Sequence, residues 1–330
     1  MSVNADGSTL VEVRGVTKRY GRTLALDDVS LDIVRGERYA VLGPNGAGKT
    51  TLIHILCTIL QADSGSATID GHEVRRHPRR ARQRLGVVFQ EPSVDTRLTV
   101  QENLDFHGRI FGVPAALRRR RIDELLDLVE LGQWRGHLVR ALSKGMQRRL
   151  EIARALVHDA ALLVLDEATA GLDAQSRSRM WQYLSELQRQ RAITVLMTTH
   201  YIEEADTCER VCVVDHGKVL TVGSPVELKE RHGRMQVRIR PRDEAAIADL
   251  RASVPGSVGV GDSLVVPVPD EAAVERLLAD HGPRLRAFSV ERPTLESVFL
   301  DLTGRGLRDA PSSARDALLA TPRSGGEPVR

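Results

Sequence analysis

The sequence Gly43-Pro44-Asn45-Gly46-Ala47-Gly48-Lys49-Thr50-Thr51 decides the fold of this chain. An apolar run at 39–42 precedes it and a helical pattern at 52–56 follows it. The pattern G-x-x-x-x-G-K-T between a strand and a helix is typical of a phosphate-binding loop, whose glycines let backbone N–H groups approach phosphate oxygens. Lys49 would reach the β- and γ-phosphates, and the Thr50 hydroxyl would bind Mg²⁺. A chance glycine-rich turn would not explain these flanks, so the sequence predicts a nucleoside triphosphate site.

Length and composition indicate a soluble protein of two domains. The chain has 330 residues, of which 42% are hydrophobic and 28% are charged. Its net charge of +3 is too small to indicate a nucleic-acid partner. The sequence contains no run of 18 apolar residues, and residues 1–7 lack the features of a signal peptide. We therefore expect a cytoplasmic chain that does not itself cross a membrane.

The cysteines do not indicate a metal site. Cys57, Cys208 and Cys212 lie in apolar runs and predict buried thiols in a reducing compartment. Cys208 and Cys212 could be grouped with His200 and His216, but the spacing matches no zinc pattern.

Two strands are expected before the phosphate-binding loop, at 10–13 and 24–33, where apolar and polar residues alternate. Between them, Lys18-Arg19-Tyr20-Gly21 predicts a turn that carries an exposed aromatic residue. Tyr20 is either a platform that stacks on an adenine ring or an incidental turn tyrosine. The residues around it leave both interpretations open.

Basic residues are dense in two segments after the loop. The stretch 75–84 is rich in arginine, and it predicts a solvated helix face rather than a nucleic-acid site because no aromatic residues are interleaved. A short buried strand is expected at 85–89, and it ends in Gln90. Residues 91–140 predict helices, in which the basic run 118–121 is expected to be a solvated helix start.

Two further patterns follow closely. Leu142-Ser143-Lys144-Gly145-Met146-Gln147-Arg148-Arg149 opens a predicted helix that continues to Leu156. Leu162-Leu163-Val164-Leu165-Asp166-Glu167 is an apolar strand that ends in paired carboxylates. Behind a phosphate-binding loop, Asp166 would orient Mg²⁺ through water and Glu167 would polarise an attacking water.

A second strand end carries a histidine. The turn 170–173, which ends in Asp173, precedes a polar helix at 175–189, and a buried strand at 193–197 leads to Thr198-Thr199-His200. A histidine after a strand is usually structural, but at the carboxyl edge of a parallel sheet it could sense a γ-phosphate. Strands at 210–215 and 219–222 close this part of the chain. The alternation of strands and helices predicts a parallel or mixed sheet covered on both faces.

The last hundred residues predict a small separate module. Their pattern gives the order β-α-β-β-α-β, which is typical of a ferredoxin-like module without an evident catalytic cluster. The expected elements are strands at 235–240, 258–260, 264–268 and 285–290, helices at 245–250 and 271–278, and a hairpin turn at 261–262. From Arg305 onward, Pro, Ser, Arg and Gly predict a disordered tail.

Taken together, these motifs resemble the ATP-binding subunit of an ABC transporter over roughly residues 11–222. The resemblance implies an α/β fold, a P-loop NTPase of the ABC ATPase cassette type with a mixed sheet core and a helical subdomain. The expected domains are a cassette at 1–231 with its helical subdomain at about 91–157, a small α+β ferredoxin-like domain at 232–304 and a tail at 305–330.

The resemblance also assigns roles. Glu167 is implied to be the general base, His200 to position the γ-phosphate, and Lys49 to act in catalysis on ATP. Tyr20 matches the adenine-stacking position, and Gln90 matches the loop glutamine that touches Mg²⁺ and faces the membrane partner. The remaining matches are Gly43 to Thr51 for the phosphates, Ser143 and Gly145 for the signature motif, Asp173 for the D-loop, and Thr50, Gln90 and Asp166 for Mg²⁺.

Partners are implied by the same resemblance. In this family two copies sandwich two ATP molecules, and Ser143 with the amides near Gly145 contacts the γ-phosphate held by the opposite copy. The resemblance further implies a separate transmembrane permease, present as two copies or as a heterodimer, no nucleic acid, and a peripheral position on the cytoplasmic face of the cell membrane. Candidate permease contacts are Glu91, Val94, Leu98 and Phe106, although Phe106 could equally pack in the core of the cassette.

Some residues depart from the family pattern. The signature reads LSKGM where the family has LSGGQ, and Ala168 stands where proline commonly follows the glutamate. Lys144 could add positive charge near the nucleotide or point to solvent. The KGM variant, with Pro293-Thr294-Leu295-Glu296-Ser297-Val298-Phe299-Leu300-Asp301-Leu302-Thr303-Gly304, resembles ABC-2-type exporters similar to the daunorubicin-resistance ATPase. This implies export of a drug, lipid or other hydrophobic or glycan-type substrate, driven by ATP hydrolysis.

Two other functions compete with export. A soluble ABC ATPase that acts on ribosomes or DNA usually carries two cassettes or long coiled-coil insertions, and this chain has one cassette and no long heptad pattern. An ATP-gated regulatory module without catalysis is the other, and the intact Lys49, Asp166, Glu167 and His200 argue against it.

Overall fold

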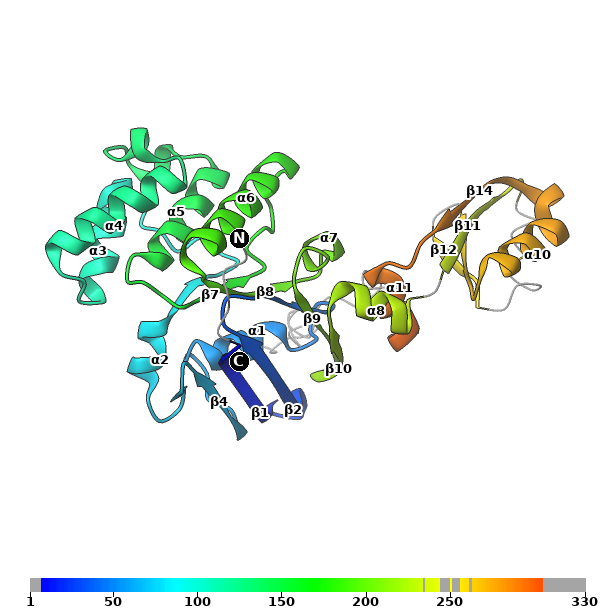
Figure 1. The fold of residues 1–330 in the computed structure, drawn as a ribbon, viewed down its shortest axis with the longest axis horizontal. Helices are drawn as coiled ribbons and strands as arrows, with labels where there is room; N and C mark the ends of the chain where they lie inside the picture. The colour runs from blue at the N-terminus through cyan, green and yellow to red at the C-terminus, as the bar shows by residue number, and fades with distance from the viewer. Residues whose placement is uncertain (1–6, 234, 244–249, 251–255, 261–262, 305–330) are drawn as a thin grey trace, which may run out of the picture. The chain divides into compact units, whose positions relative to one another are not determined.

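The computed structural model describes residues 7–233, 235–243, 250, 256–260 and 263–304. The chain divides into two compact units, formed by residues 1–220 and 221–310 in their described parts (Figure 1). The expected helix at 245–250, all but its last residue, the hairpin turn at 261–262 and the tail at 305–330 lie outside the described residues.

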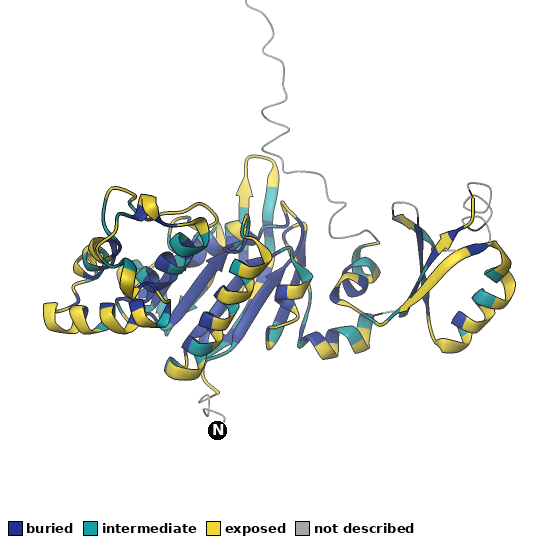
Figure 2. Ribbon diagram, turned by 90° about the horizontal axis from the view of Figure 1, so that it is seen from above, coloured by how far each residue is buried: buried dark blue, intermediate teal, exposed yellow. Residues whose placement is uncertain are grey.

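The first unit is built on a six-stranded sheet in the order β10-β9-β3-β8-β7-β6. The pairs from β9 to β6 are parallel. Three of the inner strands, β3, β7 and β8, are buried along their whole length (Figure 2), as expected for parallel strands covered on both faces. The strands are β3 Arg38–Leu42, β6 Leu85–Val88, β7 Leu162–Asp166, β8 Thr194–Thr199, β9 Arg210–Asp215 and β10 Lys218–Gly223.

A second, antiparallel sheet has the order β2-β1-β4-β5. Its strands are β1 Thr9–Tyr20, β2 Thr23–Val34, β4 Ser64–Ile69 and β5 His72–Glu73. The turn predicted at 18–21 is wrong for its first three residues, because Tyr20 pairs with Thr23 and both strands continue to the end of the hairpin. The turn itself is Gly21–Arg22.

Some helices pack beside the six-stranded sheet, and others form a separate helical region (Figure 1). They are α1 Lys49–Leu56, α2 Pro78–Arg84, α3 Val100–Ile110, α4 Ala115–Leu128, α5 Lys144–Leu156, α6 Ala174–Arg191 and α7 Ile202–Ala205. The helical prediction for 91–140 is wrong for residues 91–99, and after α4 the segment forms only two short 3-10 helices, Gly132–Trp134 and Val139–Ala141. Helix α3 begins only at Val100, because Thr99 and Glu102 form a capping box that fixes its first turn. Within the described ranges, none of the helices combines the length and apolar character that a membrane span requires.

The basic run at 118–121 corrects a second expectation. Arg118 is buried rather than solvated. Its Nε atom donates to Asp105 at 2.5 Å and its Nη1 atom donates to the Val113 carbonyl at 2.7 Å. A buried guanidinium is tolerated when it is paired and hydrogen-bonded in this way. Arg118 therefore ties α4 to α3 instead of facing water.

The second unit has a four-stranded antiparallel sheet in the order β12-β13-β11-β14. Apolar side chains from β11, β13 and α10 form its core. Two more helices of this unit, α8 and α11, contact each other. The elements are α8 Pro225–His232, β11 Met235–Pro241, β12 Val258–Val260, β13 Ser263–Val268, α10 Glu271–His281, β14 Leu285–Glu291 and α11 Leu295–Thr303.

Candidate active site

The loop that joins β3 to α1 is closely surrounded by backbone. A Cβ atom at Gly43 would lie 2.3 Å from the Val214 carbonyl oxygen, so a larger residue cannot fit there. Gly48 has a φ of 102°, and a Cβ atom at this position would lie 2.4 Å from the Ala25 carbonyl oxygen. Only glycine combines this backbone conformation with this contact. The glycines of the motif therefore fix the shape of the loop against β9 and β2.

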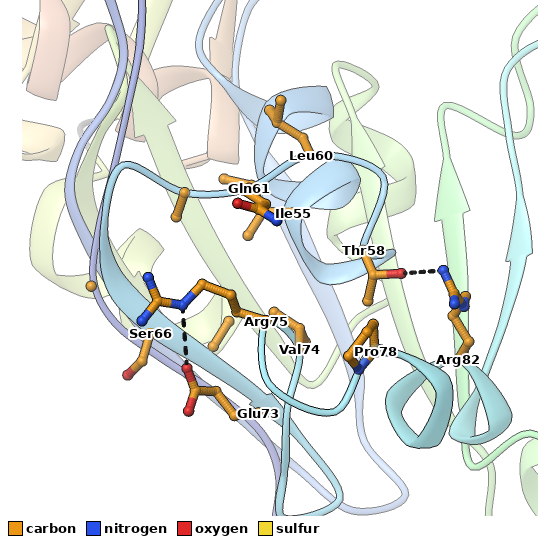
Figure 3. A pocket seen from close by; sticks show the side chains of 13 residues that line it. Ile55, Thr58, Leu60, Gln61, Ser66, Glu73, Val74, Arg75, Pro78 and Arg82 are labelled. Atoms are coloured by element: carbon orange, nitrogen blue, oxygen red, sulfur yellow. Dashed lines mark hydrogen bonds and ion pairs between the residues drawn. The ribbon is translucent and has the colours of Figure 1, made fainter.

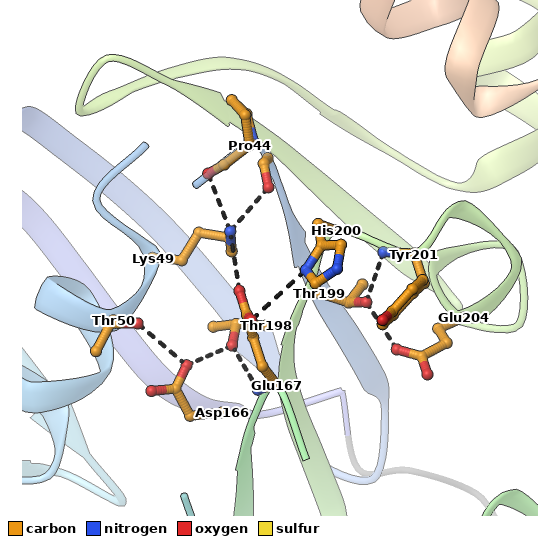
Figure 4. Close-up of polar contacts among 11 residues, drawn as sticks. Pro44, Lys49, Thr50, Asp166, Glu167, Thr198, Thr199, His200, Tyr201 and Glu204 are labelled. Carbon is orange, nitrogen blue, oxygen red and sulfur yellow. Dashed lines mark hydrogen bonds and ion pairs between the residues drawn. The ribbon is translucent and has the colours of Figure 1, made fainter. Parts of the chain in front are cut away.

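Lys49 is the first residue of α1 and is buried, with 4% of its side chain exposed. Its ammonium group donates to the carbonyls of Gly43 at 2.8 Å and Pro44 at 3.0 Å (Figure 4). It also lies 3.3 Å from the Glu167 carboxylate. Burial lowers the pKa of Lys49, and the Glu167 charge acts in the opposite direction.

Asp166 is the last residue of β7 and is buried at the carboxyl edge of the six-stranded sheet. Its Oδ1 atom accepts a hydrogen bond from the Thr198 hydroxyl at 2.5 Å and one from the Thr50 hydroxyl at 3.5 Å. Burial raises the pKa of Asp166, and the Thr198 hydrogen bond partly offsets this. Thr198 was not assigned a role from the sequence. The signal that could have identified it is its place at the end of β8, which pairs Thr198 with Asp166 in the parallel ladder.

Glu167 follows Asp166 in an unusual backbone conformation, with φ of 47°. Non-glycine residues adopt this region at a cost and often at functional sites. Its amide donates to the Thr198 hydroxyl at 3.1 Å, and its carboxylate lies 3.5 Å from His200 Nδ1. The contact with His200, together with the Lys49 charge, lowers the pKa of Glu167 although burial opposes this. The carboxylate is therefore ionised at neutral pH, as a general base must be.

His200 is supported by groups that the sequence did not single out. The Thr199 hydroxyl donates to the Glu204 carboxylate at 2.7 Å and accepts from the Tyr201 amide at 2.9 Å. Arg177 lies over the Tyr201 ring, 4.5 Å from its centroid. These contacts fix the turn between β8 and α7, and with it the backbone that carries His200 (Figure 4).

The predicted signature and D-loop residues form a second group. Ser143 caps α5 by accepting from the Met146 amide, and Asp173 caps α6 by accepting from the Ser176 amide at 2.8 Å. A Cβ atom at Gly145 would lie 2.8 Å from Ser176 Oγ, so the two helix starts lie against each other. In the described part of the chain, no hydrogen bond or ion pair joins these residues to the phosphate-binding loop.

The loop after β6, which carries Gln90, is held by α5. Arg148 donates to the carbonyls of Phe89 at 2.6 Å and Gln90 at 2.8 Å. Glu151, which is fully buried, pairs with Arg148 at 2.8 Å and accepts from the Ser93 amide at 2.5 Å. The sequence did not single out this clamp. A signal for it was the presence of charged residues at positions of α5 that otherwise face the core.

Tyr20 ends β1 and is 49% exposed. It pairs with Thr23, two residues before the Ala25 carbonyl that contacts Gly48. The ring therefore lies on the hairpin that adjoins the phosphate-binding loop, with Lys18 Nζ 5.9 Å from its centroid.

The arginine-rich stretch borders a hollow of about 180 Å³ near the end of α1 (Figure 3). Arg82 donates to the Thr58 hydroxyl at 3.2 Å, and Arg75 lies 3.9 Å from Glu73. Arg79 and Arg80 are exposed. This arrangement agrees with the solvated helix face that the sequence favoured.

Comparisons with known protein families match both units. The family described as ABC transporter matches residues 26–170. The family described as the C-terminal domain of DrrA1-3-like ATP-binding proteins matches residues 223–303.

Curated relatives match nearly the whole chain. A Nod factor export ATP-binding protein I of Ralstonia nicotianae is 41% identical over 313 residues, covering 92% of this chain and 97% of its own. The daunorubicin/doxorubicin resistance ATP-binding protein of Streptomyces peucetius is 38% identical over 318 residues, covering 93% and 96%. A linearmycin resistance ATP-binding protein of Bacillus subtilis is 32% identical and covers 91% and 100%.

Solved structures match about two thirds to three quarters of the chain. Part of a Clostridium perfringens ABC transporter complex superposes with a TM-score of 0.63 at 29% identity, covering 75% of this chain and 96% of that one. A dimeric bacterial ABC transporter cassette gives 0.58 at 29% identity, covering 65% and 98%. A post-hydrolysis cassette bound to ADP and phosphate gives the same values.

Proposed function

The chain belongs to the ABC transporter family of ATP-binding subunits, and from this premise we propose that it hydrolyses ATP to drive an exporter through a separate membrane permease. The observation that carries the proposal is the meeting of Lys49, Asp166, Glu167 and His200 at one edge of the sheet. The printed names of the relatives, which concern drug resistance and Nod factor export, support an export role for this chain as well.

ATP binding requires an exchange of partners at Lys49. Its ammonium group contacts two carbonyls and the Glu167 carboxylate. The β- and γ-phosphate oxygens offer stronger, charge-assisted hydrogen bonds than the carbonyls do. We infer that ATP draws Lys49 away from these groups and so frees Glu167. Tyr20, on the adjoining hairpin, would stack on the adenine ring.

The site fits Mg²⁺. Thr50 and Asp166 offer a hydroxyl and a carboxylate oxygen 3.5 Å apart, and hard cations prefer oxygen ligands. The raised pKa of the buried Asp166 also indicates a carboxylate that gains from a nearby cation. Thr50 and Asp166, with Gln90 as a third ligand, would hold the ion. When bound, Mg²⁺ would neutralise charge on the phosphates.

Glu167 and His200 supply the chemistry in this proposal. Glu167 is ionised and would accept a proton from the attacking water. His200, 3.5 Å from Glu167, would hydrogen-bond the γ-phosphate and orient it toward that water. The supported turn between β8 and α7 fixes the backbone that carries His200.

A second copy of the chain would complete the site. Ser143 and Gly145 lie at the start of α5, where backbone amides and the helix dipole favour an anion. We propose that they contact the γ-phosphate held by the other copy, and that Asp173 lies at the same interface through Ser176. Closure of the two copies would then be required for hydrolysis.

The permease would bind at a pocket of about 320 Å³ beside the Gln90 loop. We call this the α3–α5 pocket, lined by Ile59, Phe89, His107, Phe111, Arg154 and His158 among others. Of the contact residues expected from the sequence, Val94 does not fit, because it is buried at 8% exposure, whereas Glu91 is exposed and Leu98 is half-buried. Phe106, by contrast, is 58% exposed rather than packed in the core. The chain would thus sit on the cytoplasmic face of the membrane, without a nucleic-acid partner.

The test is to reconstitute the full chain with the membrane protein encoded beside it. ATP hydrolysis should be faster in vesicles that contain both proteins than with the chain alone, and an exported compound should accumulate only with hydrolysable ATP. An equal rate with and without the membrane protein, and no accumulation, would reject the export role.

A further inference from the structure

The α3–α5 pocket contains buried polar atoms that no described residue satisfies. Among the described residues, His107 Nε2, Arg154 Nε and His158 Nδ1 are buried and have no hydrogen-bond partner. All of these residues line the pocket, whose surface is otherwise mainly apolar. Buried polar atoms are nearly always paired in native proteins. Their concentration around one cavity indicates that a partner from outside the chain completes them.

The protonation of His158 follows from its second ring nitrogen. Its Nε2 atom lies 3.0 Å from the Leu85 carbonyl oxygen, and a carbonyl can only accept. Nε2 therefore carries the hydrogen, and Nδ1 of the neutral ring is a bare acceptor. Burial lowers the pKa of His158, and it lowers that of His107 to about 3. Both rings are neutral in the free chain.

Arg154 brings an uncompensated charge to the same pocket. Its Nη1 and Nη2 atoms donate to the Ser93 carbonyl at 2.6 Å and to the Ser93 hydroxyl at 2.5 Å. In the part of the chain that the structure describes, no carboxylate lies within ion-pair distance of it, because the nearby Glu151 is engaged by Arg148 and Ser93. The guanidinium thus has a buried nitrogen, Nε, without a hydrogen-bond partner, and no anionic partner among the described residues.

We propose that the α3–α5 pocket receives an acidic side chain presented on an apolar segment of the permease. The carboxylate would accept from Arg154 Nε and from His158, and the apolar segment would cover Ile59, Phe89 and Phe111. This inference rests on the proposed export function and specifies the chemistry of its docking element. Charge complementarity selects the carboxylate, since an amide side chain could fill the hydrogen bonds but would leave the Arg154 charge unpaired.

Docking of the carboxylate would be coupled to the uptake of a proton by His158. An imidazolium at His158 donates from Nε2 to the Leu85 carbonyl and from Nδ1 to the incoming carboxylate, so both ring nitrogens are satisfied. The incoming negative charge would raise the pKa of His158. Docking is therefore expected to strengthen as the pH falls toward that raised pKa.

In the empty pocket, the charged groups that face His158 together oppose its protonation. Arg121 from α4 and Arg154 from α5 are cations, and His107 from α3 is neutral. Asp159 favours protonation, but its carboxylate bonds Arg121 at 2.8 Å and is largely compensated. An added carboxylate thus changes the local charge balance decisively.

The first test uses the full chain and isovalerate, a small carboxylate with an apolar tail. Its neutral isostere isovaleramide serves as the matched control. Binding is followed by the NMR signals of the histidine ring protons. We expect isovalerate to shift the His107 and His158 signals, to bind about tenfold more tightly than isovaleramide, and to bind more tightly at pH 6.5 than at pH 8. Equal binding of the two compounds, or unshifted signals, would overturn the proposal.

A variant locates the proton. His158→Phe keeps a ring to stack on Phe111, whose centroid lies 3.9 Å from that of His158, but removes the acceptor. Isovalerate binding should weaken several-fold and lose its pH dependence, whereas His137→Phe, at an exposed histidine outside the pocket, should change neither. If His158→Phe does not fold, the comparison of the two compounds on the parent chain still decides the matter.

Reconstitution separates this inference from the export role. Absence of any stimulation by the membrane protein rejects the export role, whatever isovalerate does. Stimulation that is independent of pH and unchanged in His158→Phe leaves the export role intact and overturns the acidic anchor. Stimulation that increases from pH 8 to 6.5, and is lost when one acidic residue in a cytoplasmic loop of the membrane protein is changed to its amide, supports the anchor.

Discussion

The carboxyl edge of the six-stranded sheet and the α3–α5 pocket both hold buried charged or polar groups, but among the described residues only the first pairs its charges with one another. At the sheet edge, Lys49 pairs with Glu167, and Asp166 accepts from Thr198. In the pocket, Arg154 and His158 keep unpartnered nitrogens. The sheet edge must therefore exchange internal partners when its ligand arrives, whereas the pocket only gains them. A ligand at the sheet edge must compete with the internal partners of Lys49 and Asp166, and a ligand in the pocket must match the shape and the unpartnered nitrogens of the pocket.

The sharpest way to break the balance at the sheet edge is Glu167→Gln. This change removes the proton acceptor and the anion that holds Lys49, so ATP binding should persist while hydrolysis falls about a thousandfold. Single-turnover phosphate release measures the rate, and size-exclusion chromatography should detect an ATP-bound dimer. Hydrolysis at the parent rate would show that another residue is the base.

The other member of the Lys49–Glu167 ion pair is tested by Lys49→Ala. It removes the donor that would reach the phosphates, so nucleotide affinity should fall by about ten- to a hundredfold and hydrolysis should fall with it. Fluorescence titration with a labelled ATP analogue measures affinity. The matched control Lys229→Ala, far along the chain in α8, should keep parent affinity; an equal loss in both variants would remove the special role of Lys49.

The clamp of α5 on the Gln90 loop links the two regions and can be broken at Glu151→Gln. Arg148 would then be left buried without its partner, so the cassette should lose about 3 kcal/mol of unfolding free energy. Denaturant titration measures the loss. Glu186→Gln, which removes an exposed pair with Arg189, should change stability by less than about 0.5 kcal/mol. Similar midpoints for the two variants would mean that the buried pair adds nothing.

The smallest effect is expected when the second unit is removed after Gly223. Among the described residues, the hydrogen bonds and ion pairs of Lys49, Asp166, Glu167 and His200 have partners within residues 1–220, so ATP affinity should stay within about twofold of the parent value. Isothermal titration on a folded truncated chain is the measurement. A folded chain without affinity would place part of the nucleotide site in the second unit.

The arrangement of residues at the sheet edge could be predicted because these residues lie in contiguous motifs. Lys49 and Thr50 come from one loop, Asp166 and Glu167 end one strand, and His200 ends another. The carboxyl ends of parallel strands share one edge, so these motifs meet once the strands are recognised. Most strands and helices were also predicted close to their observed bounds.

The pocket and the clamp could not be predicted because they depend on contacts between distant segments. Arg118 was expected to be solvated, and only its contact with Asp105 on the preceding helix shows otherwise. His107 and His158 are 51 positions apart in the sequence, and nothing local marks them as neighbours whose rings lie 5.6 Å apart. Side-chain partners of this kind carry no periodic signal.

The position of β3 between β8 and β9 has a consequence for how the protein is made. The phosphate-binding loop follows β3 directly, yet the neighbours of β3 are synthesised far later, as the bond from the Arg38 amide to Glu209, across 171 residues, illustrates. A growing chain on the ribosome therefore exposes an unpaired apolar strand until residues beyond 215 have emerged, and such strands invite aggregation. Nascent chains arrested before β8 should be captured by chaperones and should not be retained on ATP-agarose. Chains released after β10 should be retained on ATP-agarose.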